Sequence, residues 1–198
     1  MSIDAKQVKE LRDKTGSGMM DCKKALIESG GDVEKAIKIL REKGLSAAAK
    51  RSDREVKEGQ IFCYIHPGAQ IGVMVEINCE TDFVARTDDF QQLGKDVAMQ
   101  VAASAPLALT REELDQDIVE KERDIFKNQA LQAGKPENIV DKIIEGKMEK
   151  FFSEVCLIEQ PFIKDDKMTV EDLVKAAIGK IGENIEINRF ARFEVGAD

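Results

Sequence analysis

The chain holds few residues of the kinds that perform covalent or metal chemistry. His66 is the single histidine and none of the four cysteines forms a Cys-x-x-Cys pair, so no zinc or other metal site is expected. Cys79 lies three residues before Asp82, which is compatible with a nucleophile beside a carboxylate, but the usual activating base is missing unless His66 folds close to the thiol. We expect free thiols in a reducing compartment, with a Cys63–Cys79 bridge across neighbouring strands as the open alternative. The sequence therefore predicts a protein that is not an enzyme.

The glycines near the beginning of the chain match a nucleotide-binding loop only in part. Gly16-Ser17-Gly18 begins like a dinucleotide fingerprint, but the third glycine is absent and no strand precedes it. The pattern Gly-x-x-x-x-Gly-Lys-Ser/Thr does not occur. The sequence predicts no nucleotide site and no cofactor of the chain's own.

Residues 78–86 place an aromatic side chain and a carboxylate, Phe83 and Asp82, on a short connection between an apolar run and a helix start. Connections lie at the surface and carry function more often than the elements they join. A large apolar side chain is usually buried, so a Phe83 that pins the helix to the strand is the competing interpretation. The residue types alone leave both interpretations open.

Met19 and Met20 raise the same question on an amphipathic helix. Adjacent helical residues can hardly face one interior together, and methionine suits adaptable binding surfaces because it is flexible and polarisable. From the residues alone, core filling and partner contact are equally supported.

Length and charge indicate one or two domains with different partners or faces. The 198 residues carry a net charge of −8, but residues 1–54 have 13 basic against 9 acidic residues, and residues 55–198 have 17 against 29. The acidic larger part argues against nucleic acid as the main ligand. No apolar run is long enough to span a membrane, and no secretory signal is recognised. We expect a cytoplasmic protein.

The first 54 residues predict a small domain of three helices, followed by a linker over residues 45–58. Apolar stripes occur near residues 4–13, over 19–27 and over 33–40, with turn residues between them. Asp32 is placed to cap the third helix, and Gly44 to end it. The predicted domain is similar to ubiquitin-associated domains.

Residues 55–198 predict an α+β domain, in which a three-stranded antiparallel sheet is covered by helices. Two β-rich runs, 59–66 and 70–78, flank a Pro-Gly turn, and an alternating run over 185–193 supplies the third strand. Helical patterns cover residues 88–104, 111–133 and 136–152, and a further one begins with a capping box at Thr169 and ends near 179. Thr87 is a candidate cap for the first of these helices.

Several ordered motifs resemble one family over nearly the whole chain. Thr81-Asp82-Phe83-Val84 resembles the signature of elongation factor Ts, the bacterial translation factor that exchanges nucleotide on elongation factor Tu. The stretch Leu11 to Leu26 resembles that family's N-terminal signature, and further matches occur at residues 66–73, 180–185 and 192–196. A lone Thr-Asp-Phe-Val would be weak, but agreement of several motifs in order is not expected by chance.

The resemblance implies a guanine-nucleotide exchange factor that binds elongation factor Tu and disturbs its magnesium and nucleotide site. It implies that a tip of four residues, Thr81, Asp82, Phe83 and Val84, carries the exchange. It also implies that Arg12, Met19 and Met20 dock on the partner's nucleotide-binding domain. Longer members have two related core halves, and this chain has one, which together with exposed sheet edges predicts a homodimer. Two other classes stay open: an adaptor of the ubiquitin-associated kind and a basic nucleic-acid-binding module.

Overall fold

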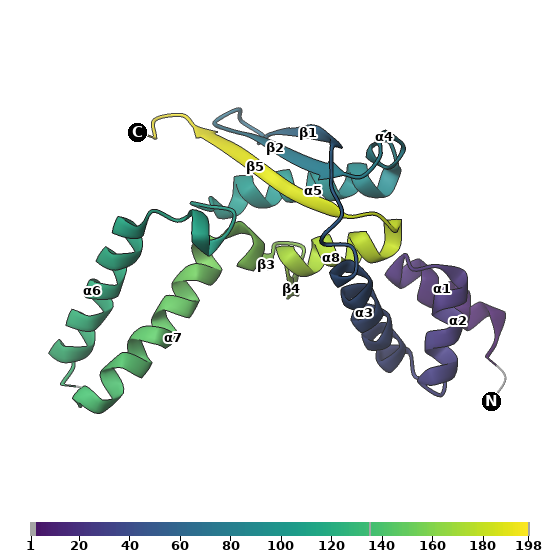
Figure 1. Cartoon of the computed structure of the whole chain (residues 1–198), viewed down its shortest axis with the longest axis horizontal. Coiled ribbons are helices and arrows are strands. Elements are labelled where there is room, and N and C mark those ends of the chain that lie inside the picture. Colours follow the sequence, from purple (N-terminus) through teal and green to yellow (C-terminus); the bar gives the residue numbers. More distant parts are fainter. Residues whose placement is uncertain (1–2, 135, 198) are drawn as a thin grey trace. The chain divides into compact units, whose positions relative to one another are not determined.

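The structure, a computed structural model, describes residues 3–134 and 136–197 (Figure 1). Its elements confirm the predicted α+β class, with helices packed around a three-stranded antiparallel sheet. By its contacts the chain divides into two compact units. The first holds residues up to Gln60 with Ile77–Leu93 and Asp172–Glu186, and the second holds Ile61–Glu76, Gly94–Glu171 and the residues from Ile187 onward. Separability at residue 54 is a different property, and it stays a prediction.

The first unit begins with the three predicted helices, α1 (Ala5–Thr15), α2 (Met19–Glu28) and α3 (Val33–Ala49). Asp4 begins α1 with a capping box, and the Asp32 carboxylate accepts the Lys35 N–H at 3.1 Å, as predicted for a cap. Gly16 ends α1 in the left-handed conformation, which glycine adopts without strain. The shared core consists of one side of each helix: Val8, Leu11, Cys22, Ala25, Leu26 and Ala36.

Two details of this domain were predicted wrongly. Gly44 does not end α3, which continues to Ala49 and takes up the first part of the predicted linker. A Cβ placed on Gly179 of α8 (Val170–Ile181) would lie 2.8 Å from the Gly44 Cα, so Gly179 allows α8 to approach α3 closely at this point. Ile27, assigned to the apolar stripe of α2, is mostly exposed.

The sheet consists of β1 (Glu58–Ile65), β2 (Ile71–Cys79) and β5 (Ile185–Glu194), in the order β1-β2-β5. Along β2 the alternate side chains are buried, as a strand with one covered face requires. Helix α5 (Asp88–Ser104) lies along that face (Figure 1), and Thr87 caps it by accepting the Phe90 N–H at 3.4 Å. Gly94 of α5 lies against the Phe62 ring so closely that a Cβ at this position would overlap it.

The second unit contains a helical hairpin, α6 (Gln116–Gln132) and α7 (Glu137–Val155), where two helical patterns were predicted. The two helices pack through an apolar seam that includes Ala130, Val140, Ile144 and Met148. At the base, two short 3-10 turns, η1 (Arg111–Glu113) and η2 (Leu157–Glu159), flank the hairpin. The Arg111 guanidinium binds Glu149 and Glu159 there and lies 4.4 Å from the centre of the Phe152 ring.

A small hairpin of β3 (Pro161–Phe162) and β4 (Asp165–Thr169) was not predicted. Its two strands are too short and too polar to give a strand pattern. Two buried amides hold it, because the Gln100 side chain donates to Gln160 and to the Pro161 carbonyl and accepts the Ile163 N–H. Buried polar groups that are fully hydrogen-bonded in this way fix one arrangement of the chain.

Candidate functional site

The predicted tip forms a separate helix, α4 (Asp82–Ala85), between β2 and α5 (Figure 1). Thr81 precedes it in extended conformation and its hydroxyl accepts the Val84 N–H at 3.5 Å, which makes Thr81 the cap. The sequence predicted a short connection here but not a helical turn.

Phe83 projects from this turn into solvent, with 77% of its surface exposed. Ala85 is buried, and two residues along an α-helix point to nearly opposite sides, so anchoring through Ala85 turns Phe83 outward. Val84 is half-buried beside them. The interpretation of Phe83 as a core residue of the free chain is therefore wrong.

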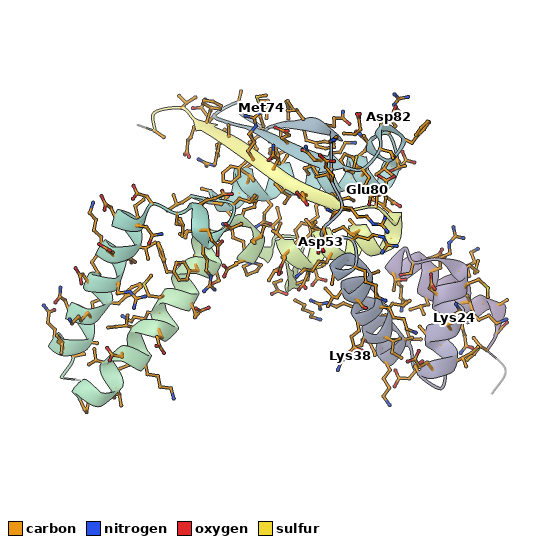
Figure 2. All side chains as sticks on the ribbon, viewed as in Figure 1. Lys24, Lys38, Asp53, Met74, Glu80 and Asp82 are labelled. Carbon is orange, nitrogen blue, oxygen red and sulfur yellow. The ribbon has the colours of Figure 1, made fainter. Side chains whose placement is uncertain are left out.

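Asp82 lies on the outer side of the same turn (Figure 2). Its carboxylate accepts a hydrogen bond from the Arg86 guanidinium at 2.8 Å, one helical turn later. Exposed pairs of this kind contribute only about 0.3–0.5 kcal/mol, so a competing partner can replace Arg86 at small cost.

Two carboxylates, Glu183 and Glu80, make the contacts at the beginning of the tip. Glu183 accepts two hydrogen bonds from Thr81, from the backbone N–H at 3.0 Å and from the hydroxyl at 2.7 Å. Glu80 accepts the Asn184 N–H at 2.6 Å and binds Arg54, and these contacts lower the pKa of the Glu80 carboxyl. Glu183 and Asn184 were not among the predicted site residues, although both belong to one of the motifs that carried the family resemblance.

Cys79 beneath the tip does not have the environment of a nucleophile. Burial, and then the nearby Glu183 carboxylate, raise the pKa of the Cys79 thiol to about 11. The thiol donates to the Thr81 carbonyl at 3.2 Å. Reactive cysteines have lowered pKa values, so this thiol is protonated at neutral pH and serves the packing of the corner. All four cysteines are free, and the alternative bridge between Cys63 and Cys79 is absent.

The second predicted set surrounds the α1–α2 turn of the same unit. Met19 and Met20 are 47% and 61% exposed, and Arg12 is exposed in the last turn of α1. Cys22 and Leu26 supply the buried side of α2, so neither methionine fills the core. The beginning of α2 thus presents two adjacent exposed apolar side chains, and the last turn of α1 presents an exposed cation.

Within residues 3–134 and 136–197, no group of three or more histidine, cysteine, aspartate or glutamate side chains is arranged to hold a metal ion. Within the same ranges, no helix has the length and apolar character needed to cross a bilayer.

Comparison with known proteins assigns the family. The sequence profile described as elongation factor TS matches residues 4–197. The chain belongs to the elongation factor Ts family. An elongation factor Ts from Carboxydothermus hydrogenoformans is 59% identical over 98% of this chain and 89% of its own length. One from Fervidobacterium nodosum is 55% identical over 99% of this chain and its entire length.

Family membership places the chain among the translation elongation factors of protein biosynthesis. An elongation factor Ts from Solidesulfovibrio magneticus, 57% identical, is covered over 98% of its length. This chain and these relatives therefore match over nearly their whole lengths.

Proposed function

We propose that this chain is a guanine-nucleotide exchange factor that binds elongation factor Tu with GDP and promotes GDP release in the cytoplasm during translation elongation. Family membership supports the partner. The observation that carries the proposal is the exposure of Phe83 on a capped helical turn. A large apolar side chain held in water on a fixed element is poised for a partner's surface.

In this proposal the tip inserts beside the magnesium and nucleotide site of elongation factor Tu. Phe83 wedges between elements of the partner, and Asp82 exchanges Arg86 for a partner group. Thr81 and Val84 fix the turn. Binding of the factor and binding of the nucleotide weaken each other, and this coupling is reciprocal.

The tip needs a wider interface around it. An acceleration of ~10⁴ requires about 5.5 kcal/mol of barrier reduction, whereas burying one phenylalanine contributes about 1.5–3 kcal/mol. We assign the remainder to docking through residues 1–54, with Arg12, Met19 and Met20 on the partner's nucleotide-binding domain. No cofactor, membrane or direct nucleic-acid contact enters this scheme.

The test is release of fluorescently labelled GDP from elongation factor Tu, with and without the chain. The expected result is a release rate that rises with the concentration of the chain and then saturates. A release rate that stays at its spontaneous value, with no complex formed in gel filtration, would refute the proposal.

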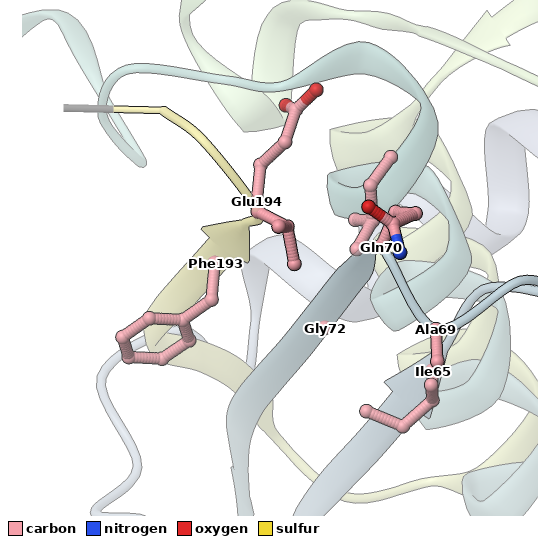
Figure 3. Close-up of a pocket in the computed structure, with 8 residues that line it drawn as sticks. Ile65, Ala69, Gln70, Gly72, Phe193 and Glu194 are labelled. Carbon is pink, nitrogen blue, oxygen red and sulfur yellow. The ribbon is translucent and has the colours of Figure 1, made fainter.

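We further propose that two copies pair through the outer face of the sheet in the second unit. Ile65 and Phe193 flank Gly72 there and line a hollow at one end of the sheet (Figure 3). Ile61, Met74 and Val195 are also largely exposed, which makes an apolar surface of the kind that marks an interface. Symmetric dimers are the commonest oligomers, and a dimer yields a two-to-two complex with the partner.

Light scattering at micromolar concentration tests this pairing. The wild-type chain should give twice its monomer mass of 22.0 kDa, and Phe193→Asp should give the monomer with an unchanged circular dichroism spectrum. A wild-type chain that is monomeric, alone and in a one-to-one complex, would refute it.

A further inference from the structure

The end of α8 and its connection to β5, residues 180–184, contact the tip, the segment after α3 and the α1–α2 turn, all in the first unit. At the tip, the Thr81 hydroxyl gives its one hydrogen to Glu183 at 2.7 Å. Its lone pairs are then directed to the Val84 N–H that it caps. Because Glu183 also accepts the Thr81 backbone N–H, the carboxylate fixes both the chain direction at Thr81 and the cap of α4.

The next residue, Asn184, holds the segment that follows α3. Its side chain is almost fully buried and donates to the carbonyls of Arg54, at 2.9 Å, and Ser52, at 3.4 Å. Its backbone N–H donates to Glu80, the residue before Thr81. One residue thus joins the beginning of the tip to the chain segment that leads from the three-helix domain.

Two further contacts bring the same connection to the N-terminal helices. The Arg51 guanidinium donates to the Gly182 carbonyl at 3.0 Å and to the Ala47 carbonyl at 2.8 Å. The Lys180 ammonium binds Asp89, at the start of α5, at 2.6 Å. It also lies so close to Gly16 that a Cβ there would come within 2.8 Å of it.

We propose that Glu183 and Asn184 are positioning residues for nucleotide exchange. Glu183 holds α4 so that Phe83 stays exposed in one orientation, and Asn184 joins this tip to the segment that carries the docking helices. Neither residue needs to touch the partner. The inference rests on the exchange function proposed above and adds the residues that give the tip its fixed geometry.

The contacts predict different kinetic effects for the two positions. Glu183→Ala removes both acceptors of Thr81 and loosens the tip, so the maximal rate of GDP release should fall about 10- to 100-fold, because small displacements of an acting group have effects of this size. The half-saturating concentration should change little. Glu183→Gln keeps one acceptor oxygen, so its maximal rate should lie between those of wild type and Glu183→Ala. Glu120→Ala, which removes an exposed carboxylate from α6, is the matched control and should retain wild-type kinetics.

Asn184→Ala should act on affinity instead. It keeps the backbone N–H that binds Glu80 but frees the segment at Arg54, so the docking helices and the tip are no longer held at a fixed distance from each other. The half-saturating concentration should rise while the maximal rate persists, since linked contacts lose effective concentration when their geometry loosens. Asn184→Ser, with one shorter donor, should be intermediate, and it replaces the alanine variant if that variant melts early.

A double-variant cycle separates positioning from a direct role. If Glu183 acts through the tip, Glu183→Ala should have almost no further effect in a chain that already carries Phe83→Ala. If Glu183→Ala lowered the maximal release rate by the same factor in the wild-type and the Phe83→Ala chain, the inference would be overturned.

Amide hydrogen exchange of the free chain makes the test independent of the proposed function. Glu183→Ala should speed exchange at the Thr81 and Val84 amides and leave the core of β2 protected. Unchanged protection at Thr81 would overturn the inference even if the wild-type chain releases GDP as proposed. Conversely, a wild-type chain without effect on GDP release refutes the nucleotide-exchange function. Faster amide hydrogen exchange at Thr81 in Glu183→Ala would still establish that Glu183 holds the tip.

Discussion

Replacing Phe83 with alanine should affect stability and exchange to very different extents. In the free chain only about a quarter of the side chain is covered, since 77% of Phe83 is exposed. Full burial of a phenylalanine contributes about 1.5–3 kcal/mol, so the variant should lose about 0.3–0.7 kcal/mol of stability. For a chain of this length that corresponds to about 1–3 °C in melting temperature.

In the proposed complex the exposed part of the ring would become buried. The same scale gives about 1.2–2.3 kcal/mol for that part, which corresponds to a loss of about 8- to 50-fold in exchange. The variant should therefore retain residual activity, because the docking contacts remain. In the proposed mechanism, displacement of the partner's magnesium site by the ring would add to this loss.

The assay compares labelled-GDP release, circular dichroism and thermal melting for wild type, Phe83→Ala and Leu107→Ala. Leu107 is 57% exposed in the second unit and controls for the removal of any exposed apolar side chain. Its variant should exchange nucleotide at the wild-type rate. A fall of 10 °C or more in melting temperature for Phe83→Ala, with exchange per folded molecule preserved, would refute the reasoning and return Phe83 to a structural role.

Three further predictions use other parts of the chain. Changing both Met19 and Met20 to alanine should raise the half-saturating concentration in the GDP-release assay at least about tenfold with the maximal rate preserved. The reason is that burial of each large side chain contributes about 1.5–3 kcal/mol. An unchanged half-saturating concentration would show that the pair is not part of the docking surface. Gly94→Ala should cost about 1–3 kcal/mol in urea unfolding through overlap with the ring beneath it, whereas a stable variant would show that the ring has room to move. The Asn184 N–H lowers the pKa of Glu80, so the stabilisation is present above the ordinary pKa of a glutamate and is lost as the pH falls through the lowered value. Wild type should melt above Glu80→Gln at pH 7, the difference should disappear as the pH falls below the lowered pKa of Glu80, and a pH-independent difference would contradict the assignment.

Local patterns predicted much of the fold. Asp32 and Thr87 cap their helices as expected, because a cap depends on three or four neighbouring residues. Gly44 was misassigned because α3 continues past it to Ala49, and Gly179, which lies far along the chain, packs against it in a way that no local pattern reveals. The β3–β4 hairpin depends likewise on buried amides contributed by other elements.

The candidate site, too, depends on contacts between residues that are far apart in the sequence. Hydrophobicity could not decide between a buried and an exposed Phe83, since the answer depends on which side of a four-residue helix Ala85 anchors. The family resemblance identified the tip residues, but it did not reveal what holds them. The contact between Thr81 and Glu183 spans 102 positions and became visible only in the folded chain.

The ion-paired base of the α6–α7 hairpin has a mechanical consequence. Helix α6 has 17 residues and extends for about 25 Å, so the hairpin is a lever whose pivot is the Arg111 cluster. A rotation of about 5° at the pivot moves the far end by about 2 Å, while the helices themselves stay straight. The Arg111 ion pairs resist such a rotation together with the buried cluster of Ala108, Leu114 and Cys156 at the same base.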